Sequence, residues 1–489
     1  MVQSQTVYIN FRGGIVSPGN LENILKIAKN YKIAHVRFGL RQQLVVDVPV
    51  KYFDAFVGRC LDQDVSCSDK KQALPNLVSS YPAAGIFSGE TWLREGVYKD
   101  VFDLFDYEPR LKVNVCDSTQ NLVPLYTGHI NWVSSPAVHF WQLHLRIPRT
   151  LSVHRFPGLV YTNDIARISK SIEQLILENP ATQTASAIFD LLAASNINNK
   201  PEVENVPQPA FSLPYYEGFN RYDNNFWLGI YRRDELFSVP FLLDVCAICL
   251  QTKIGQLYTT PWKSLVIKGI ETMDRSIWEH VLGRYRINVR HAANELNWQV
   301  EENSEEGLQI KRHIVRYFDK EDVRTFGLCF AVQAKPYSRM FGSVLIRKEA
   351  IKNPGRLKSL ERFEILHTKD FNPNSEGFIS YRKNVEKDYL GTYLVSLCKA
   401  FYDQQQAMFS NPVPITPTLG TAAKQVTNSV HQCTDCLTVY DPVVGEPELE
   451  IAAGTAFNEL NPGFCCPLCG SPKSSFKEVD QSTLQLQTA

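Results

Sequence analysis

Two Cys-x-x-Cys motifs near the end of the chain constrain its folding more than any other feature. The first joins Cys433 to Cys436, the second joins Cys466 to Cys469, and 29 residues separate them. Cysteines with this spacing share a tight turn, so two such turns can bring four thiolates into a tetrahedron around one metal ion. Zinc and iron both accept four sulfur ligands, so the spacing alone leaves the metal open.

The residues around the two motifs narrow the choice of metal. In chain order they form the short patterns Tyr-Asp-Pro at Tyr440, Gly-Glu-Pro at Gly445, Gly-Thr-x-Phe at Gly454 and Lys-x-x-Phe at Lys473. Together with the cysteines, this order closely resembles rubredoxin, the one-iron electron carrier, over residues 431–480. The resemblance implies one iron ion with four ligands, Cys433, Cys436, Cys466 and Cys469. A zinc knuckle that only holds the fold is the alternative.

Three residues near the site depart from the usual rubredoxin pattern. Cys465 stands where the family usually has an apolar residue, and we do not expect it to bind the metal. Leu437 replaces the usual glycine after the first motif, and Phe464 replaces the usual tryptophan. We expect Leu437 to alter the backbone N–H donation to sulfur that tunes the reduction potential of such a centre.

The ligand set predicts what the centre can do. Metal-bound cysteines are thiolates, so the site carries one negative charge with ferric iron and two with ferrous iron. All four coordination positions are taken, which excludes a bound substrate and favours an electron relay. We expect a small aromatic core to keep water from the metal, made of Tyr440, Phe457, Phe464 and Phe476. A unit of this size buries little apolar surface, so we expect that it needs the bound metal for its stability.

Length and composition place this unit at the end of a larger globular chain. The 489 residues are 44% hydrophobic, and the length suits roughly three or four domains. No apolar run approaches the roughly 20 residues of a membrane span, and the first residues do not read as a signal peptide. Twelve cysteines, four of them assigned to a metal, fit a reducing compartment. We therefore expect a cytoplasmic protein that binds neither a membrane nor nucleic acid.

Charge is distributed unevenly along the chain. Residues 431–480 hold eight acidic and two basic side chains, a net charge of −6, and residues 1–430 carry the balancing +6. An acidic carrier joined to a basic body favours electrostatic docking, either within the chain or on a partner protein. Ordinary acidic surface that keeps the protein in solution is the alternative.

The rest of the chain contains a repeated pattern. Residues 7–61 predict the order strand, helix, strand, strand, helix, with Ser17 as the N-cap of the first helix and strands over 7–16, 33–38 and 42–48. The pattern returns 221 residues later, where Ser238 matches Ser17 and Arg233 matches Arg12. A nearly constant spacing over separate landmarks indicates a duplicated unit.

A second resemblance appears in this repeated part. Residues 37–43 resemble the R-x-T-x-R-Q-N strand of nitrite and sulfite reductases, and residues 260–264 and 109–115 resemble two further strands of that family. The resemblance implies an α+β fold in which two ferredoxin-like half-domains alternate with two larger α/β units. The expected domains are half-domain 1 (1–85), α/β unit 1 (86–200), half-domain 2 (216–300), α/β unit 2 (301–410), a flexible proline-rich linker (411–430) and the rubredoxin domain (431–480).

The cofactors of that reductase family match this sequence only in part. The family's [4Fe–4S] cluster takes ligands from C-x5-C and C-x3-C pairs after the second half-domain, where this chain offers only Cys329 and Cys398. We therefore expect no [4Fe–4S] cluster and a loss of the reductase activity. Candidate ligands for the carboxylates of sirohaem, or for another anion, remain at Arg12, Arg37 and Arg41. The alternative is that these arginines are strand residues with solvated charges.

Three functional hypotheses follow from these patterns. The first is an electron-transfer protein whose degenerate reductase-like body is a docking platform. Its partners would be a donor and an acceptor protein, with nitrite or sulfite reductase as a candidate, and no residue is assigned a catalytic role. The second is a reductase that binds sirohaem or haem and is fed by its own rubredoxin domain. The third is a structural zinc-binding protein.

Overall fold

The computed structural model divides the chain into two compact units, the body (residues 1–410) and the C-terminal unit (residues 411–489). Each unit is considered by itself. The structure describes residues 3–69, 72–87, 92–119, 122–124, 126–150, 152–178, 184–195, 197–201, 211, 213–222, 224–289, 294–335, 340–350, 361–375, 377–410, 429–435, 438–443, 445–446, 449, 451–452, 454–467 and 470–480. Over these residues, no helix has both the length and the apolar character needed to cross a membrane.

The first part of the body contains a five-stranded antiparallel sheet with the strand order β14-β3-β4-β1-β5. The chain forms β1 (Ser4–Asn10), β2 (Ile15–Val16), α1 (Pro18–Asn30), β3 (His35–Phe38), β4 (Gln43–Pro49), α2 (Phe53–Leu61) and β5 (Ser68–Asp69). The strand expected over residues 7–16 is interrupted, because Gly13 and Gly14 adopt φ angles of 65° and 80° in a tight turn.

A second antiparallel sheet follows, with the strand order β12-β13-β16-β15-β2. Its part of the chain forms β12 (Gly218–Tyr222), β13 (Asn225–Ile230), β14 (Phe237–Ser238), α6 (Val239–Gln251), β15 (Leu257–Thr259), β16 (Leu265–Ile270) and α7 (Arg275–Arg284). The two sheets exchange one short strand each. Strand β2, from the first part of the chain, pairs with β15 in the second sheet, and β14, from the second part, pairs with β3 in the first sheet. Each sheet is therefore completed by a strand from the other.

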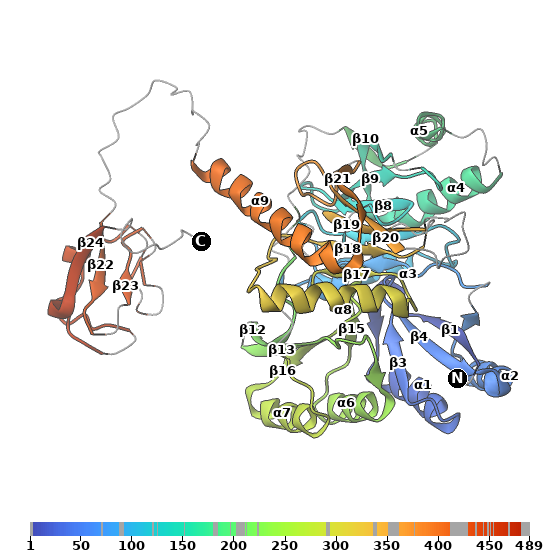
Figure 1. Cartoon of the computed structure of the whole chain (residues 1–489), viewed down its shortest axis with the longest axis horizontal. Coiled ribbons are helices and arrows are strands. Elements are labelled where there is room, and N and C mark those ends of the chain that lie inside the picture. Colours follow the sequence, from blue (N-terminus) through green and yellow to red (C-terminus); the bar gives the residue numbers. More distant parts are fainter. Residues whose placement is uncertain are drawn as a thin grey trace. The chain divides into compact units, whose positions relative to one another are not determined.

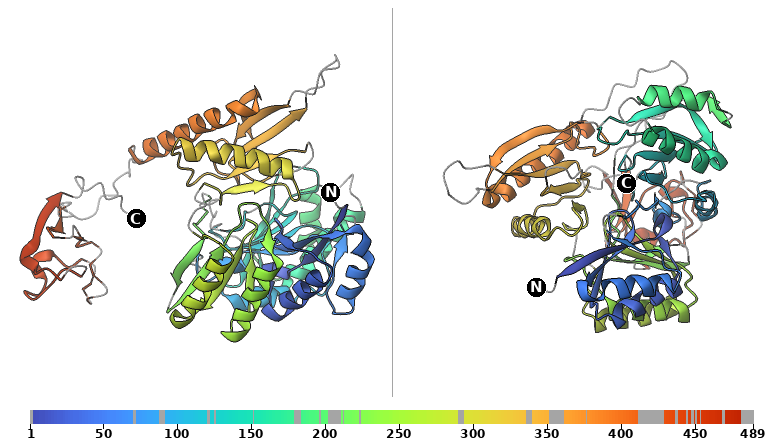
Figure 2. Two further views of the ribbon diagram at one scale, coloured as in Figure 1. Left: turned by 60° about the horizontal axis from the view of Figure 1, so that its bottom comes forward. Right: turned by 90° about the vertical axis from the view of Figure 1, so that its right-hand side faces the viewer.

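Helices α1 and α6 begin in the same way and pack against each other in one hydrophobic core (Figures 1 and 2). The Ser17 side chain accepts a hydrogen bond from the Asn20 N–H at 3.1 Å, and the Ser238 side chain accepts one from the Phe241 N–H at 3.5 Å. Each serine is an N-cap, as the sequence predicts for Ser17.

Two mixed sheets, of six and five strands, complete the body. The first has the order β11-β10-β9-β8-β7-β6 and the second has the order β17-β18-β19-β20-β21. The part of the chain that builds the first sheet forms β6 (Val78–Ser79), α3 (Glu95–Asp103), β7 (Val113–Cys116), β8 (Ile130–Ser134), β9 (Phe140–Leu145), β10 (His154–Tyr161), α4 (Ile165–Glu178), α5 (Ala185–Ala193) and β11 (Asn199–Pro201). The part that builds the second sheet forms β17 (Trp298–Val300), α8 (Glu305–Lys320), β18 (Phe330–Gln333), β19 (Val344–Ala350), β20 (Glu361–His367), β21 (Ile379–Val385) and α9 (Leu390–Ser410).

The C-terminal unit is a small three-stranded antiparallel sheet with the order β23-β22-β24. Its strands are β22 (Ser429–Cys433), β23 (Val439–Tyr440) and β24 (Phe476–Asp480). Elsewhere the described residues of this unit form turns, short 3-10 helices and two isolated β-bridges. A sheet of this size buries too little apolar surface to be stable alone, so the turns must contribute a further constraint.

Candidate metal centre

One cysteine from each motif lies in the core of the C-terminal unit. Cys433 ends β22 and is 0% exposed, and Cys466 lies on the second motif and is 2% exposed. Both belong to one buried cluster with the aromatic residues predicted to shield the metal, Tyr440, Phe457, Phe464 and Phe476. The predicted aromatic core is therefore confirmed.

Backbone hydrogen bonds shape both turns. The Cys433 N–H donates to the Thr438 carbonyl at 2.8 Å, and the Cys466 N–H donates to the Ser471 carbonyl, also at 2.8 Å. The Gly470 N–H donates back to the Cys466 carbonyl at 2.8 Å, with Gly470 at a φ angle of +74°. The first cysteine of each motif is thus held by a backbone hydrogen bond to the residue five positions later.

The two turns are tied together through β24. The Thr434 N–H donates to the Ser475 carbonyl at 2.9 Å, and Cys433 lies opposite Phe476 in the pairing of β22 with β24. The Ser471 hydroxyl also donates to the Asp435 carboxylate at 2.6 Å. These contacts fix the first motif against the segment that follows the second.

Two of the four predicted ligands, Cys436 and Cys469, lie outside the described residues, and so does Leu437. For that reason no group of three or more metal-ligating side chains appears among the residues that the structure describes. The two cysteines that are described fit a soft metal ion, because they are buried thiols brought from separate turns into one apolar cluster. Cys465, by contrast, is exposed and its thiol donates to the Gly463 carbonyl at 3.6 Å.

Negative charge surrounds this core. Burial raises the pKa of Tyr440, and the carboxylates of Glu446, Asp441 and Glu459 raise that pKa further. Lys473, one of the two basic side chains within residues 431–480, donates to the Leu460 carbonyl at 2.7 Å. The surface charge of the unit is therefore mostly that of its carboxylates.

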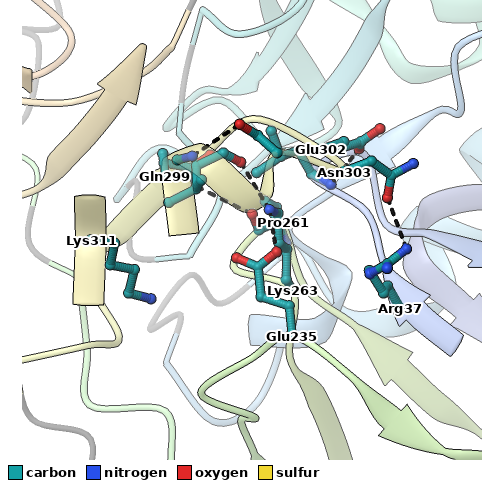
Figure 3. Close-up of polar contacts among 12 residues, drawn as sticks. Arg37, Glu235, Pro261, Lys263, Gln299, Glu302, Asn303 and Lys311 are labelled. Carbon is teal, nitrogen blue, oxygen red and sulfur yellow. Dashed lines mark hydrogen bonds and ion pairs between the residues drawn. The ribbon is translucent and has the colours of Figure 1, made fainter. Parts of the chain in front are cut away.

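In the body, the three candidate arginines are bonded to protein acceptors. Arg12 donates through Nη1 to the carbonyls of Phe102 and Phe105 at 3.2 and 3.0 Å, at the end of α3. Arg37 forms an ion pair with Asp47 and donates to the Asn303 side chain at 3.0 Å (Figure 3). Both guanidinium groups thus stabilise contacts within the body.

Arg41 is bonded more extensively than the other two. Its guanidinium donates to the Asn76 carbonyl through Nε at 3.1 Å and through Nη2 at 2.6 Å. It also donates to the Val113 carbonyl at 2.9 Å and to the Asn114 side chain at 3.2 Å. Since an arginine has five N–H donors, little donor capacity is left for a cofactor carboxylate. Sirohaem binding by Arg12, Arg37 and Arg41 stays a prediction, and the hydrogen bonds of the three guanidinium groups to protein acceptors do not favour it.

A group of buried charges beside β17 was not predicted from the sequence. Lys263 and Glu235 form an ion pair at 2.6 Å, with side chains 5% and 7% exposed (Figure 3). Lys263 also donates to the Val300 carbonyl at 2.8 Å, which links the turn before β16 to β17. No sequence motif marks this ion pair, although Lys263 lies 221 residues after Gln42 and both residues adopt positive φ angles, 56° and 59°.

Comparison with known proteins decides the family of the C-terminal unit. The rubredoxin family profile matches residues 430–476. Rubredoxin-2 of Chlorobaculum tepidum is 40% identical over 48 residues, which are 10% of this chain and 92% of that protein. The chain belongs to the rubredoxin family through this unit. A rubredoxin unit implies an iron centre in a cysteine site and a role in electron transfer.

Two longer relatives match the chain over stretches of similar length. The high molecular weight rubredoxin of Moorella thermoacetica is 49% identical over 49 residues, 10% of this chain and 21% of that protein. The anaerobic nitric oxide reductase flavorubredoxin of Pectobacterium carotovorum is 37% identical over 57 residues, 12% of this chain and 11% of that protein. The chain therefore spans about a fifth or less of these two longer relatives.

The body resembles a solved structure. The NirA protein of Mycobacterium tuberculosis superimposes with a TM-score of 0.61 over 81% of each chain, at 12% sequence identity. This likeness shows a shared fold, and it agrees with the mixed α+β architecture expected from the sequence.

Proposed function

We propose that the protein transfers single electrons through one iron ion bound by Cys433, Cys436, Cys466 and Cys469. The observation that carries the proposal is the rubredoxin match over residues 430–476, which spans both cysteine motifs. Bound iron would supply a change of one electron between its ferrous and ferric states. The chain's own residues would supply four thiolates and an aromatic core that keeps water away.

The charges of the two units suggest how partners are recognised. The rubredoxin unit carries a net charge of −6 before any metal is bound. We therefore propose redox partner proteins with a positive surface, and nitrite or sulfite reductase is one candidate because the body shares a reductase-like fold. The body would act as a docking platform, joined to the carrier by the proline-rich residues 411–430.

We also propose that the body is a duplication of a half-domain and an α/β unit, with the boundaries expected from the sequence. Three pairs of residues 221 positions apart support this organisation. Ser17 and Ser238 cap α1 and α6, and Gln42 and Lys263 share a left-handed conformation. Gly39 and Thr260 also begin corresponding turns, since each accepts a backbone hydrogen bond from the residue three positions later.

A reductase that holds sirohaem in the body is the second candidate, and the NirA-like fold is the observation that favours it. The hydrogen bonds of Arg12, Arg37 and Arg41 to protein acceptors speak against it. A colour measurement distinguishes the candidates, because sirohaem adds an absorption band that an iron–cysteine centre lacks.

The test is to purify the full chain, assay iron and zinc, and record the visible spectrum before and after dithionite. We expect one iron per chain and a red colour that bleaches on reduction. A further sirohaem band would support the reductase. A colourless protein that holds zinc after expression with ample iron would overturn the electron-transfer proposal and leave a structural role.

Two neighbouring cysteines provide a matched pair of variants for the same assay. Cys466→Ser removes a buried thiol of the proposed ligand set, so we expect the iron content and the red colour to fall sharply. Cys465→Ser alters the exposed neighbouring thiol, so we expect both to be retained. Equal loss in the two variants would contradict the ligand assignment.

A further inference from the structure

The last sheet of the body has an open edge at β21. Ile379–Val385 pair with β20 on one side, and no strand in the described part of the chain pairs with their other side. Most residues of β21 are exposed, including Ile379 at 47%, and the side chain of Lys383 is 71% exposed. An edge of this kind presents backbone N–H and C=O groups that another strand can pair with.

The other large sheet shows what this edge can accept. Strands β6 to β10 and strands β17 to β21 are paired in the same sequence, two parallel pairs followed by two antiparallel pairs. In the first sheet one more strand, β11, pairs with β10, with Lys200 opposite Leu159. The matching position beyond β21 holds no strand among the described residues. The exposure of most β21 residues leaves this edge accessible to one more antiparallel strand.

The charges of β21 indicate what kind of strand would fit. The strand contains Arg382 and Lys383 and no acidic residue. Arg382 lies over the ring of Tyr381 at 4.9 Å, and Lys383 lies 4.0 Å from the Glu364 carboxylate. Antiparallel pairing of β21 with β21 of a second copy would bring these cations close to their counterparts, and like charges on facing strands are destabilising.

We propose that β21 is a docking strand for an extended acidic segment of a partner protein. The segment would add to the sheet beside β21 through main-chain hydrogen bonds, which supply affinity, while its carboxylates would face Arg382 and Lys383 and supply specificity. The exposed side chains of Phe378 and Ile379, 38% and 47% exposed, would contact apolar residues of the segment. This surface belongs to the body and does not depend on the metal of the rubredoxin unit.

The test uses the full chain and labelled synthetic peptides of the same length as β21, made of valine except for two adjacent central residues that are either glutamate or lysine, so that one charge lies on each face of the added strand. We expect the glutamate peptide to bind more tightly than the lysine peptide, by about tenfold or more, since two charge contacts are at stake. A glutamate peptide with alternate amides N-methylated keeps its charge but cannot form the ladder, and we expect it to lose most of its affinity. Hydrogen exchange should show new protection of the β21 amides when the unmodified peptide binds.

Variants of the protein give the controls. Arg382→Glu with Lys383→Glu should weaken binding of the glutamate peptide by about tenfold or more, while Lys399→Glu, on the exposed side of α9, should leave it unchanged. Equal binding of the acidic and basic peptides, full affinity of the N-methylated peptide, or protection at amides away from β21 would overturn the proposal. So would concentration-dependent protection of β21 in the protein alone, because the strand would then be covered by a second copy.

The iron content and spectrum should be the same in all variants, which separates this test from that of the electron carrier.

Discussion

Two lysines lie deep inside the body, where their charge is costly. Burial lowers the pKa of Lys268 and the pKa of Lys311 to about 8. Lys268 donates to the Ala84 carbonyl at 2.7 Å, and Lys311 donates to the Tyr231 hydroxyl at 2.6 Å. An unfolded lysine keeps its usual pKa near about 10.4, so between the two values the unfolded chain holds more protons than the folded chain. Stability contributed by these groups therefore rises with pH from about pH 8, and the cost is fully present below that pH.

The Lys311→Met variant tests this pH dependence. Between pH 8 and pH 9 the wild-type free energy of unfolding should gain about 1 kcal/mol from Lys311, and the variant should lack that gain. Lys320→Met, on the same helix but exposed, should keep the wild-type slope. The measurement is urea unfolding at several pH values, and the slope is the readout, because both variants can also shift the absolute stability. A wild-type slope in Lys311→Met would show that Lys311 is not buried as a charge.

Gly470 follows the second cysteine motif, and substituting it tests how the backbone there contributes to stability and metal retention. Its φ angle of +74° is unfavourable for a residue with a side chain, although a Cβ atom there would meet no atom within 4 Å. Gly470→Ala should therefore destabilise the rubredoxin unit by about 1 kcal/mol through backbone strain alone. Iron release to a chelator should become faster. Gly463→Ala is the control, because Gly463 has an ordinary φ and a Cβ there would make only an ordinary contact, at 3.5 Å from the Asn461 side-chain oxygen.

Among the elements, α1 and α6 show how short-range signals specify structure in the body. Each begins after a serine with a proline in its first turn, and that pattern predicts a helix start from sequence alone. Ser17→Ala should cost about 1 kcal/mol of stability, because one backbone N–H loses its acceptor. Ser238→Ala should cost less, since its hydrogen bond is longer, 3.5 Å against 3.1 Å. Chemical denaturation of the two variants measures the difference, and an equal or reversed order would count against the cap geometry.

The same elements show where prediction from sequence stops. The cysteine turns and the aromatic core were predicted because their signals are local and chemically specific. The pairing of β2 with β15 and of β14 with β3 was not, because strands of two residues have no periodicity and their partners lie far away in the chain. The Lys263–Glu235 ion pair was missed for a similar reason, since its 28-residue separation matches no motif.

For the whole molecule, the division of charge between the two units has a measurable effect. Electron transfer from the acidic rubredoxin unit to a basic haem protein should slow as salt is added, because screening reaches about 10 Å at 0.1 M ionic strength. Asp441→Asn with Glu446→Gln should weaken the salt dependence. Stopped-flow measurement at several ionic strengths tests this, with an uncharged quinone as the control acceptor. A rate to the haem protein that does not change with salt would exclude electrostatic docking.

The exchange of β2 and β14 between the two small sheets also bears on the origin of the body. A chain that ended after the first half would leave β3 without its outer neighbour and would carry β2 with no sheet to join. Two such chains could complete each other's sheets by trading these strands, as a swapped dimer does. If the body arose by duplication, its single-unit ancestor would have been stable as a pair, and gene fusion would have converted an association between molecules into a connection within one.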